Sequence, residues 1–321
     1  MMPVNLDKPQ QWKADIAASV DMYNDWFMRF APDAFRTTRL RTTKDVEAAL
    51  QATSNLTDIR PAMLRLHPEI LPTLRMSTCP PIAVDRLIGL AGVSSSLVRS
   101  MEIEKRLPPR MSVASADADL EKIADIIERM ADPDIFPWIG RGVPAEQTEI
   151  HRAATIVADR LCGAVANPII RNAQEKRQLA LIKVWLEGKG YRQLPGGDGV
   201  KFNAMPPGTF SFRMNVPIKL EGGIQSINIP VDAVVMSKTA AAGDMPIFFE
   251  AKSAGDFTNT NKRRKEEAMK MAQLRSTYGS GVRFNLFLCG YFDSGYLGYE
   301  AAEGIDWVWE HRIDDLAAFG I

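Results

Sequence analysis

The segments Ile229-Pro-Val-Asp232-Ala-Val-Val235 and Ile247-Phe-Phe-Glu250-Ala-Lys252 each contain charged residues within or directly after an apolar run. Short apolar runs of this kind indicate buried strands. Because side chains alternate between the two faces of a strand, Glu250 and Lys252 point the same way and Ala251 points the opposite way. If the two strands are neighbours, Asp232, Glu250 and Lys252 converge at one place in the fold.

The sequence on either side of these strands predicts a mixed α/β core. It indicates a helix over 172–188, strands over 209–216, 225–236 and 247–252, a charged helix over 261–278, strands over 282–292 and 307–309, and a terminal helix over 314–319. A helix that links two strands of one sheet makes them parallel by a crossover connection.

The first half of the chain has the apolar spacing of helices, over 11–30, 45–52 and 117–130. Proline and glycine residues between 133 and 144 indicate an irregular connector. We therefore expect a mostly α-helical domain over 1–145 and an α/β domain over 146–321.

The composition excludes several classes of protein. The 321 residues are 46% hydrophobic and 24% charged, which is typical of a globular chain. We expect no membrane span and no signal peptide, because apolar runs are short and residues 1–13 are polar. Three cysteines are too few for a disulfide framework or a thiolate metal site, so a reducing cytoplasm is expected. With only three histidines, the chemistry is expected to depend on carboxylates and lysines.

Asp232 and Glu250, beside the backbone carbonyl of Ala251, supply the hard oxygen ligands that suit Mg²⁺. Such an ion neutralises a scissile phosphate and lowers the pKa of a bound water. The ammonium of Lys252 can orient the attacking water or stabilise charge that develops on the phosphorus. This arrangement predicts a metal-dependent phosphodiester hydrolysis that needs no histidine.

A Glu-x-Lys pattern alone has little specificity, and the chain contains a second one, Glu187-Gly-Lys189. That copy ends a predicted helix and is followed by glycine, which is typical of an exposed helix end. The strand before Glu250 and the apolar run around Asp232 distinguish the first copy. The alternative for the first copy is a charged pair at a strand end beside a strand-terminal aspartate.

These residues resemble a known superfamily. The order helix, strand, strand with Asp232, strand with Glu-x-Lys, helix, strand is similar to the PD-(D/E)xK nuclease core, with Pro230-Val-Asp232 in place of Pro-Asp. More narrowly, the stretches Cys79–Ser94 and Glu250–Lys265 resemble the XamI-type restriction endonucleases.

The resemblance implies a restriction-endonuclease-like mixed sheet flanked by helices and preceded by a mostly α-helical N-terminal domain. It implies a type II enzyme that cleaves both strands of a palindromic, GTCGAC-like DNA site with Mg²⁺ and leaves 5′-phosphates. Asp232, Glu250 and Lys252 take the family's catalytic positions. Such nucleases often add a glutamate from the first core helix, for which Glu175 is the candidate; its alternative is an exposed helix residue.

Positive charge is clustered although 39 basic residues balance 39 acidic ones. Binding of DNA responds to the local field more than to the total charge. One cluster follows Lys252, where hydroxyl, amide and basic side chains at a helix start can contact phosphates or base edges. Its candidate residues are Thr258, Asn259, Asn261, Lys262, Arg263, Arg264 and Lys265. The alternative is a solvated helix in which Glu266 and Glu267 pair with Lys270.

The N-terminal half contains two further candidates. Residues 83–104 resemble a helix-turn-helix with Gly92 at the turn, and the second helix of such a motif enters the major groove. Its candidate contacts are Ser94, Ser95, Ser96 and Arg99. The basic run 36–44, with Arg39 and Arg41, is a phosphate-contact candidate. For both segments the alternative is an ordinary helical surface.

The leading hypothesis is a sequence-specific DNA endonuclease that acts as a homodimer, because two-fold symmetry matches a palindrome. Its cognate methyltransferase would be a genetic partner, not a physical one. The alternatives are a repair or structure-specific nuclease of the same fold, a non-catalytic helix-turn-helix DNA-binding protein, and a small-molecule hydrolase.

Overall fold

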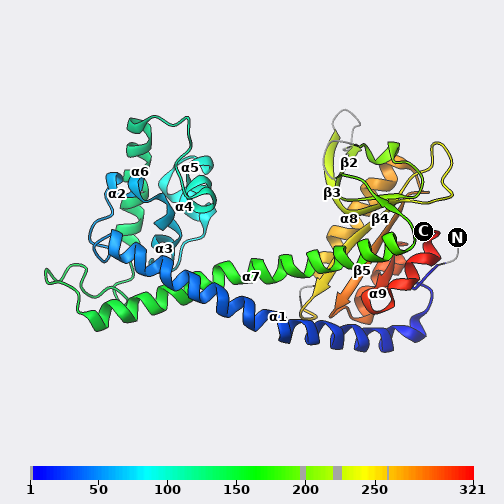
Figure 1. The fold of residues 1–321 in the computed structure, drawn as a ribbon, viewed down its shortest axis with the longest axis horizontal. Coiled ribbons are helices and arrows are strands. Elements are labelled where there is room, and N and C mark those ends of the chain that lie inside the picture. Colours follow the sequence, from blue (N-terminus) through cyan, green and yellow to red (C-terminus); the bar gives the residue numbers. More distant parts are fainter. Residues whose placement is uncertain (1–2, 196–199, 220–225, 259) are drawn as a thin grey trace. The chain divides into compact units, whose positions relative to one another are not determined.

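The computed structural model describes residues 3–195, 200–219, 226–258 and 260–321. The chain forms two compact units, Ala31–Ile170 and Met1–Phe30 with Arg171–Ile321. Helices α1, Pro9–Ala52, and α7, Gln147–Gly188, contribute residues to both units (Figure 1). The boundary expected between residues 145 and 146 therefore does not coincide with this division, and the first 30 residues group with the sheet.

The helical unit, residues 31–170, packs around one apolar core. Its amphipathic helix α6, Val113–Met130, begins at Ser112, whose hydroxyl accepts a hydrogen bond from the Ser115 amide at 3.2 Å. Leu120, Ile123 and Ile127 recur at helical spacing and are fully buried. The shorter helices of this unit are α2, Pro61–Leu66, α3, Leu71–Met76, α4, Val84–Ala91, and α5, Ser95–Arg99.

The other unit contains a mixed sheet with strand order β1-β2-β3-β4-β5-β6. The strands are β1, Arg192–Gln193, β2, Thr209–Lys219, β3, Ser226–Met236, β4, Ile247–Ala254, β5, Arg283–Gly290, and β6, Asp306–Trp309. Pairs β2–β3 and β3–β4 are antiparallel, whereas β1–β2, β4–β5 and β5–β6 are parallel. Helix α8, Thr260–Tyr278, links β4 to β5, as the predicted crossover requires.

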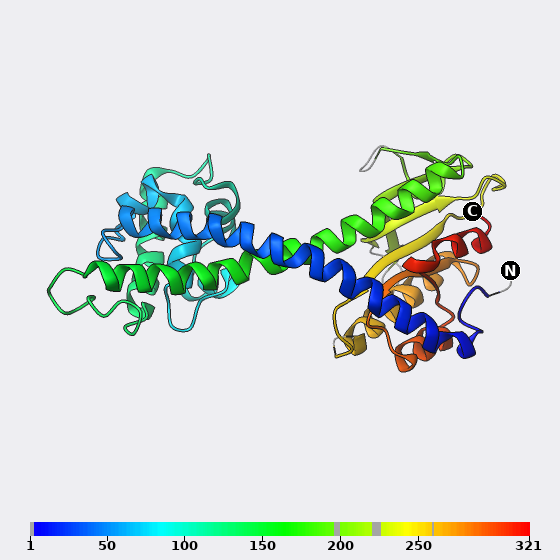
Figure 2. The same cartoon turned by 60° about the horizontal axis from the view of Figure 1, so that its bottom comes forward.

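Helices cover both faces of the sheet (Figures 1 and 2). On one face, Leu179, Ile182 and Leu186 of α7 pack against β3, β4 and β5 together with the 3₁₀ segment Glu310–Phe319. On the other, α8 and α9, Ser294–Ala302, pack against β4 and β5 beside the start of α1. The central strands are therefore buried on both sides, which explains their continuous apolar runs.

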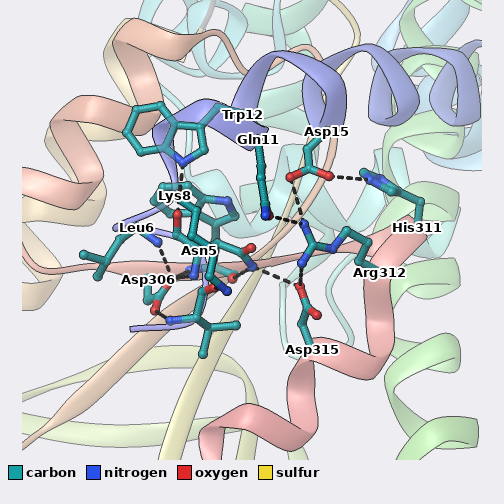
Figure 3. Close-up of polar contacts among 12 residues, drawn as sticks. Asn5, Leu6, Lys8, Gln11, Trp12, Asp15, Asp306, His311, Arg312 and Asp315 are labelled. Carbon is teal, nitrogen blue, oxygen red and sulfur yellow. Dashed lines mark hydrogen bonds and ion pairs between the residues drawn. The ribbon is translucent and has the colours of Figure 1, made fainter. Parts of the chain in front are cut away.

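The N-terminal segment is joined to the last strand by polar contacts (Figure 3). The Asp306 carboxylate accepts hydrogen bonds from the backbone amides of Val4 at 2.6 Å, Asn5 at 2.9 Å and Leu6 at 3.1 Å. Arg312 pairs with Asp15 of α1 at 3.0 Å and with Asp315 at 2.9 Å. These contacts explain why residues 1–30 belong to the sheet unit.

Several sequence expectations need correction. Residues 11–30 and 45–52 were expected as separate helices, but α1 continues through Pro32 from Pro9 to Ala52. Helix α9 was not predicted, because Gly295 and Gly298 weaken its helical pattern. One helix, α7, is long and apolar enough to match a membrane span by composition. The same property is typical of a core helix, and α7 contributes buried residues to the cores of both units.

Candidate active site

The site lies where the sheet divides. Strands β3 and β4 pair only from Val235↔Ile247 to Ala233↔Phe249. Beyond that point β3 stays paired with β2 and β4 stays paired with β5. Asp232 and Glu250 are the next residues on the two diverging strands. The Asp232 carboxylate accepts a hydrogen bond from the Ala251 amide at 2.9 Å, which replaces the next step of the ladder.

The same position marks a reversal in the packing of β2 and β3. Phe210 and Phe212 pack in the core beneath α7, whereas Met214 and Val216 pack in the core beneath α8. Arg213 lies between them with a left-handed φ of 52°, a conformation that costs about 1–3 kcal/mol for a residue other than glycine. The pairing of β2 with β3 is interrupted between Phe212↔Ala233 and Met214↔Val231, at Arg213 and Asp232, so the reversal lies at the candidate catalytic aspartate.

The Glu250 side chain is in contact with those of Lys252 and Lys270, and Glu250 is only 6% exposed. Its Oε1 accepts hydrogen bonds from Lys252 Nζ at 3.2 Å and from Lys270 Nζ of α8 at 2.6 Å. Its Oε2 is buried and has no hydrogen-bond partner among the described residues. Two cations thus share one carboxylate oxygen, while the other oxygen keeps its capacity to bind a ligand.

Burial and the Glu250 carboxylate raise the pKa of Asp232 to about 6. For Lys252, burial alone would lower the pKa, but the carboxylates of Glu250 and Glu267 raise it above its ordinary value. Lys252 is therefore an ammonium at neutral pH. It can donate hydrogen bonds to developing negative charge but cannot act as a general base.

Helix α7 borders the same strands. Gln178 is buried and donates hydrogen bonds to the carbonyls of Lys252 and Phe287, both at 3.2 Å. Glu175 accepts a hydrogen bond from Arg213 at 2.7 Å and adds to the negative field at Asp232. Glu175 is therefore close to the site and ion-paired, not simply an exposed helix residue.

The residues present fit a divalent cation. Asp232 and Glu250 supply carboxylates from two diverging strands, and the unpartnered Oε2 of Glu250 adds a free acceptor. Burial, together with repulsion between these carboxylates, raises the pKa of Asp232, and a cation would relieve that repulsion. Within the described residues, no three His, Cys, Asp or Glu side chains form a ready-made metal cluster. A carbonyl, such as that of Ala251, and waters would complete the coordination.

The sequence missed the roles of Glu267 and Lys270. The sequence offered them only as members of a solvated helix face, the alternative to DNA contact, but Glu267 is 0% exposed and Lys270 bonds to Glu250. Met271 and Leu274 are buried on the same helix. The i, i+3 and i+4 spacing of Glu267, Lys270, Met271 and Leu274 was the signal that this helix face is turned toward the sheet.

The candidate DNA contacts after β4 are only partly described. Thr258 bonds to Asp256, Lys265 is exposed, and the Arg264 guanidinium lies over the Tyr299 ring at 4.8 Å. Asn259 lies outside the described residues. Asn261, Lys262 and Arg263 lie in α8, and their side chains are outside the described part of the chain.

In the helical unit, residues 83–104 form α4, a turn and α5, which continues as a π-helical turn over Ser100–Glu104. Gly92 takes the left-handed conformation at the turn. Ser94 caps α5 by accepting a hydrogen bond from the Leu97 amide at 3.2 Å, while Ser95 and Ser96 are exposed. Arg99 is exposed and pairs with Asp85 at 3.4 Å.

The basic run 36–44 lies in α1. Arg39 is half exposed, pairs with Asp159 at 3.6 Å and lies over the Phe35 ring. Arg41 is exposed. The structure places these arginines on the helical unit and leaves their contact with DNA as a prediction.

Comparison with known proteins identifies the class to which this fold and site belong. The XamI restriction endonuclease family matches residues 54–309. The type II restriction enzyme SalI from Streptomyces albus G is 55% identical over 317 residues, which cover 99% of each chain. No solved structure matches the chain significantly. The protein belongs to the XamI restriction endonuclease family.

The predictions of a restriction endonuclease family and of a type II site-specific deoxyribonuclease are confirmed. The mixed α/β architecture with a helical region in the first half is also confirmed. The roles of individual site residues stay predictions.

Proposed function

We propose that this protein is a type II restriction endonuclease of the PD-(D/E)xK fold that hydrolyses double-stranded DNA with Mg²⁺. The observation that carries the proposal is the division of the sheet at Asp232 and Glu250, with Lys252 on the Glu250 side. By resemblance to the family, the site would be a GTCGAC-like palindrome and the products would carry 5′-phosphates.

In this mechanism a water attacks phosphorus and releases a proton to solvent, the bond from phosphorus to the 3′ oxygen breaks, and that oxygen takes up a proton. The products are a 5′-phosphate and a 3′-hydroxyl. Asp232, Glu250 and the Ala251 carbonyl would hold the ion, which would supply charge neutralisation at the scissile phosphate. Lys252 donates hydrogen bonds to the attacking water or to the developing phosphoryl charge, because it is protonated. Glu175 adds negative charge near Asp232 and holds Arg213.

DNA would be held by the basic start of α8 and by the helical unit. The positive side chains near the metal site suit backbone phosphates, and the α4–α5 segment suits groove contact through Ser94, Ser95, Ser96 and Arg99. Arg39 and Arg41 suit phosphate contact. A homodimer would match the symmetry of a palindrome. The setting would be the cytoplasm, where a cognate methyltransferase protects host DNA.

The test is digestion of a fully mapped phage DNA by the purified protein, with Mg²⁺ and with chelator, beside Lys252→Ala. Discrete fragments that require Mg²⁺ and disappear in the variant are expected, and their sizes give the recognition site. A smear would indicate a non-specific or repair enzyme. Intact DNA in every lane, over several salt concentrations and DNAs, would overturn the catalytic assignment.

A further inference from the structure

A second buried carboxylate, that of Glu267, lies within salt-bridge distance of Lys252. Glu267 of α8 is 0% exposed, and its Oε1 lies 3.5 Å from Lys252 Nζ. Its Oε2 accepts a hydrogen bond of 2.5 Å from the Tyr296 hydroxyl of α9. The Lys252 ammonium is thus within salt-bridge distance of two carboxylates, those of Glu250 and Glu267.

A fully buried carboxylate is costly unless it is paired and hydrogen-bonded. Glu267 meets this condition through the Lys252 ammonium, the Tyr296 hydroxyl and a side-chain hydrogen bond with Glu300. Helices α8 and α9 pack together around it, so its position is fixed by the core and not by solvent. Removing one partner of such a buried pair is costly, because the remaining charge is left without a counter-charge.

Glu300 of α9 is a second buried carboxyl group beside Glu267. Glu300 is also 0% exposed. Burial and the Glu267 carboxylate raise the pKa of Glu300 to about 9, so Glu300 is protonated at neutral pH. Of the two adjacent buried acids, only Glu267 faces the Lys252 ammonium at salt-bridge distance.

We infer that Glu267 is a positioning residue for the catalytic Lys252. It acts as the fixed counter-charge that holds the ammonium when Glu250 is engaged by the metal, and Tyr296 fixes the Glu267 carboxylate in turn. The inference rests on the proposed function, because it presumes that Lys252 acts on the reacting water or phosphate. Glu300 serves as a neutral neighbour that keeps no charge of its own beside Lys252.

The test compares Glu267→Gln with Glu300→Gln in the full-length protein on cognate DNA. Glu267→Gln removes the counter-charge, and we expect kcat to fall about 10- to 100-fold, the usual effect of losing an outer-shell partner, with KM little changed. Glu300→Gln imitates the protonated acid, so we expect nearly wild-type kcat. Glu266→Gln, the same change at an exposed neighbour on α8, is the control.

A double-mutant cycle separates positioning from general damage. If Glu267 acts through Lys252, adding Glu267→Gln to Lys252→Ala should cause no further loss of the residual rate. Tyr296→Phe keeps the charge and removes one hydrogen bond, so it should cause a smaller loss. Thermal unfolding would reveal whether Glu267→Gln lowers the amount of folded protein. In that case Tyr296→Phe still tests the inference, because it leaves the buried charge in place.

Equal losses in Glu267→Gln and Glu300→Gln, or losses that multiply on the Lys252→Ala background, would overturn the inference and make the cluster structural. Wild-type kcat in both Glu267→Gln and Tyr296→Phe would also overturn it. Wild-type activity of Lys252→Ala itself would instead refute the proposed catalytic site, so the two failures are distinguishable.

Discussion

The chain contains the pattern Glu-x-Lys twice, and the two copies lie in opposite environments. Glu250-Ala-Lys252 is in a strand at the division of the sheet, with Glu250 buried and Lys252 within salt-bridge distance of two carboxylates. Glu187-Gly-Lys189 lies at the end of α7, where all three residues are exposed and the Glu187 carboxylate lies 3.8 Å from Lys183 Nζ. We therefore expect the chemistry to depend on burial and on converging strands, and not on the Glu-x-Lys pattern alone.

The largest expected difference between the copies is at the lysines. Lys252→Ala should lower kcat by about 10³-fold, because it removes the ammonium that faces developing charge. Lys189→Ala should change kcat less than about twofold, since surface substitutions away from a site rarely matter. Single-turnover cleavage of cognate DNA measures both. Comparable losses in the two variants would show that the buried copy is not special.

A smaller difference is expected at the glutamates. Glu250→Gln leaves Lys252 and Lys270 close together without their shared counter-charge, and it weakens the metal site. We expect a loss of at least about 10² in kcat/KM, partly recovered at higher Mg²⁺ concentration. Glu187→Gln should match wild type over the whole Mg²⁺ titration. An Mg²⁺-independent loss in Glu250→Gln would argue against a ligand role.

An effect of intermediate size is expected at Glu175 of α7, the helix whose end contains the exposed Glu187-Gly-Lys189 pattern. Glu175→Gln should lower kcat about tenfold, because Glu175 orients Arg213 and contributes to the field at Asp232 without being fixed in the buried cluster. Lys176→Gln, at the exposed next residue, is the matched control. If Glu175→Gln cleaves at the wild-type rate, the glutamate is not part of the catalytic group.

The smallest effect concerns stability and involves no DNA. The pKa of Glu300 is raised from 4.5 to about 9, so between these values the folded protein retains a proton that the unfolded chain has released. The stability from this group is complete below pH 4.5 and is lost as pH rises toward 9. Glu267, Glu303 and Lys252 are the charged groups that face it. Glu300→Gln should therefore flatten the fall in Tm between pH 5 and 9; parallel curves would contradict the shift.

Much of this site was predictable from sequence. Strand periodicity located β3, β4 and β5, and the charged residues within the apolar runs located Asp232, Glu250 and Lys252. What the sequence could not show depends on tertiary packing. The pairing of Lys270 with Glu250 and the burial of Glu267 follow from how α8 lies on the sheet. The left-handed conformation of Arg213 could not be predicted either, because arginine rarely adopts it and the sequence around it gives no indication of it.

Tertiary packing also explains why the extent of α1 was not predicted. The 44-residue α1 contains Pro32, which in sequence marks a helix end, yet the helix continues on both sides of it. The grouping of residues 1–30 with the sheet depends on long-range contacts such as Val4 with Asp306. Local patterns carry no information on contacts between residues so distant in the chain.

Metal binding at the division of the sheet tests the central claim most directly. Mn²⁺, which takes the same oxygen ligands as Mg²⁺ and is visible by electron paramagnetic resonance, should be titrated into the wild type, Asp232→Asn, Glu250→Gln and Glu187→Gln. The account predicts one site per chain that is weakened about 10-fold or more in Asp232→Asn and Glu250→Gln and unchanged in Glu187→Gln. Wild-type Mn²⁺ binding by Glu250→Gln, or equal weakening by Glu187→Gln, would contradict it.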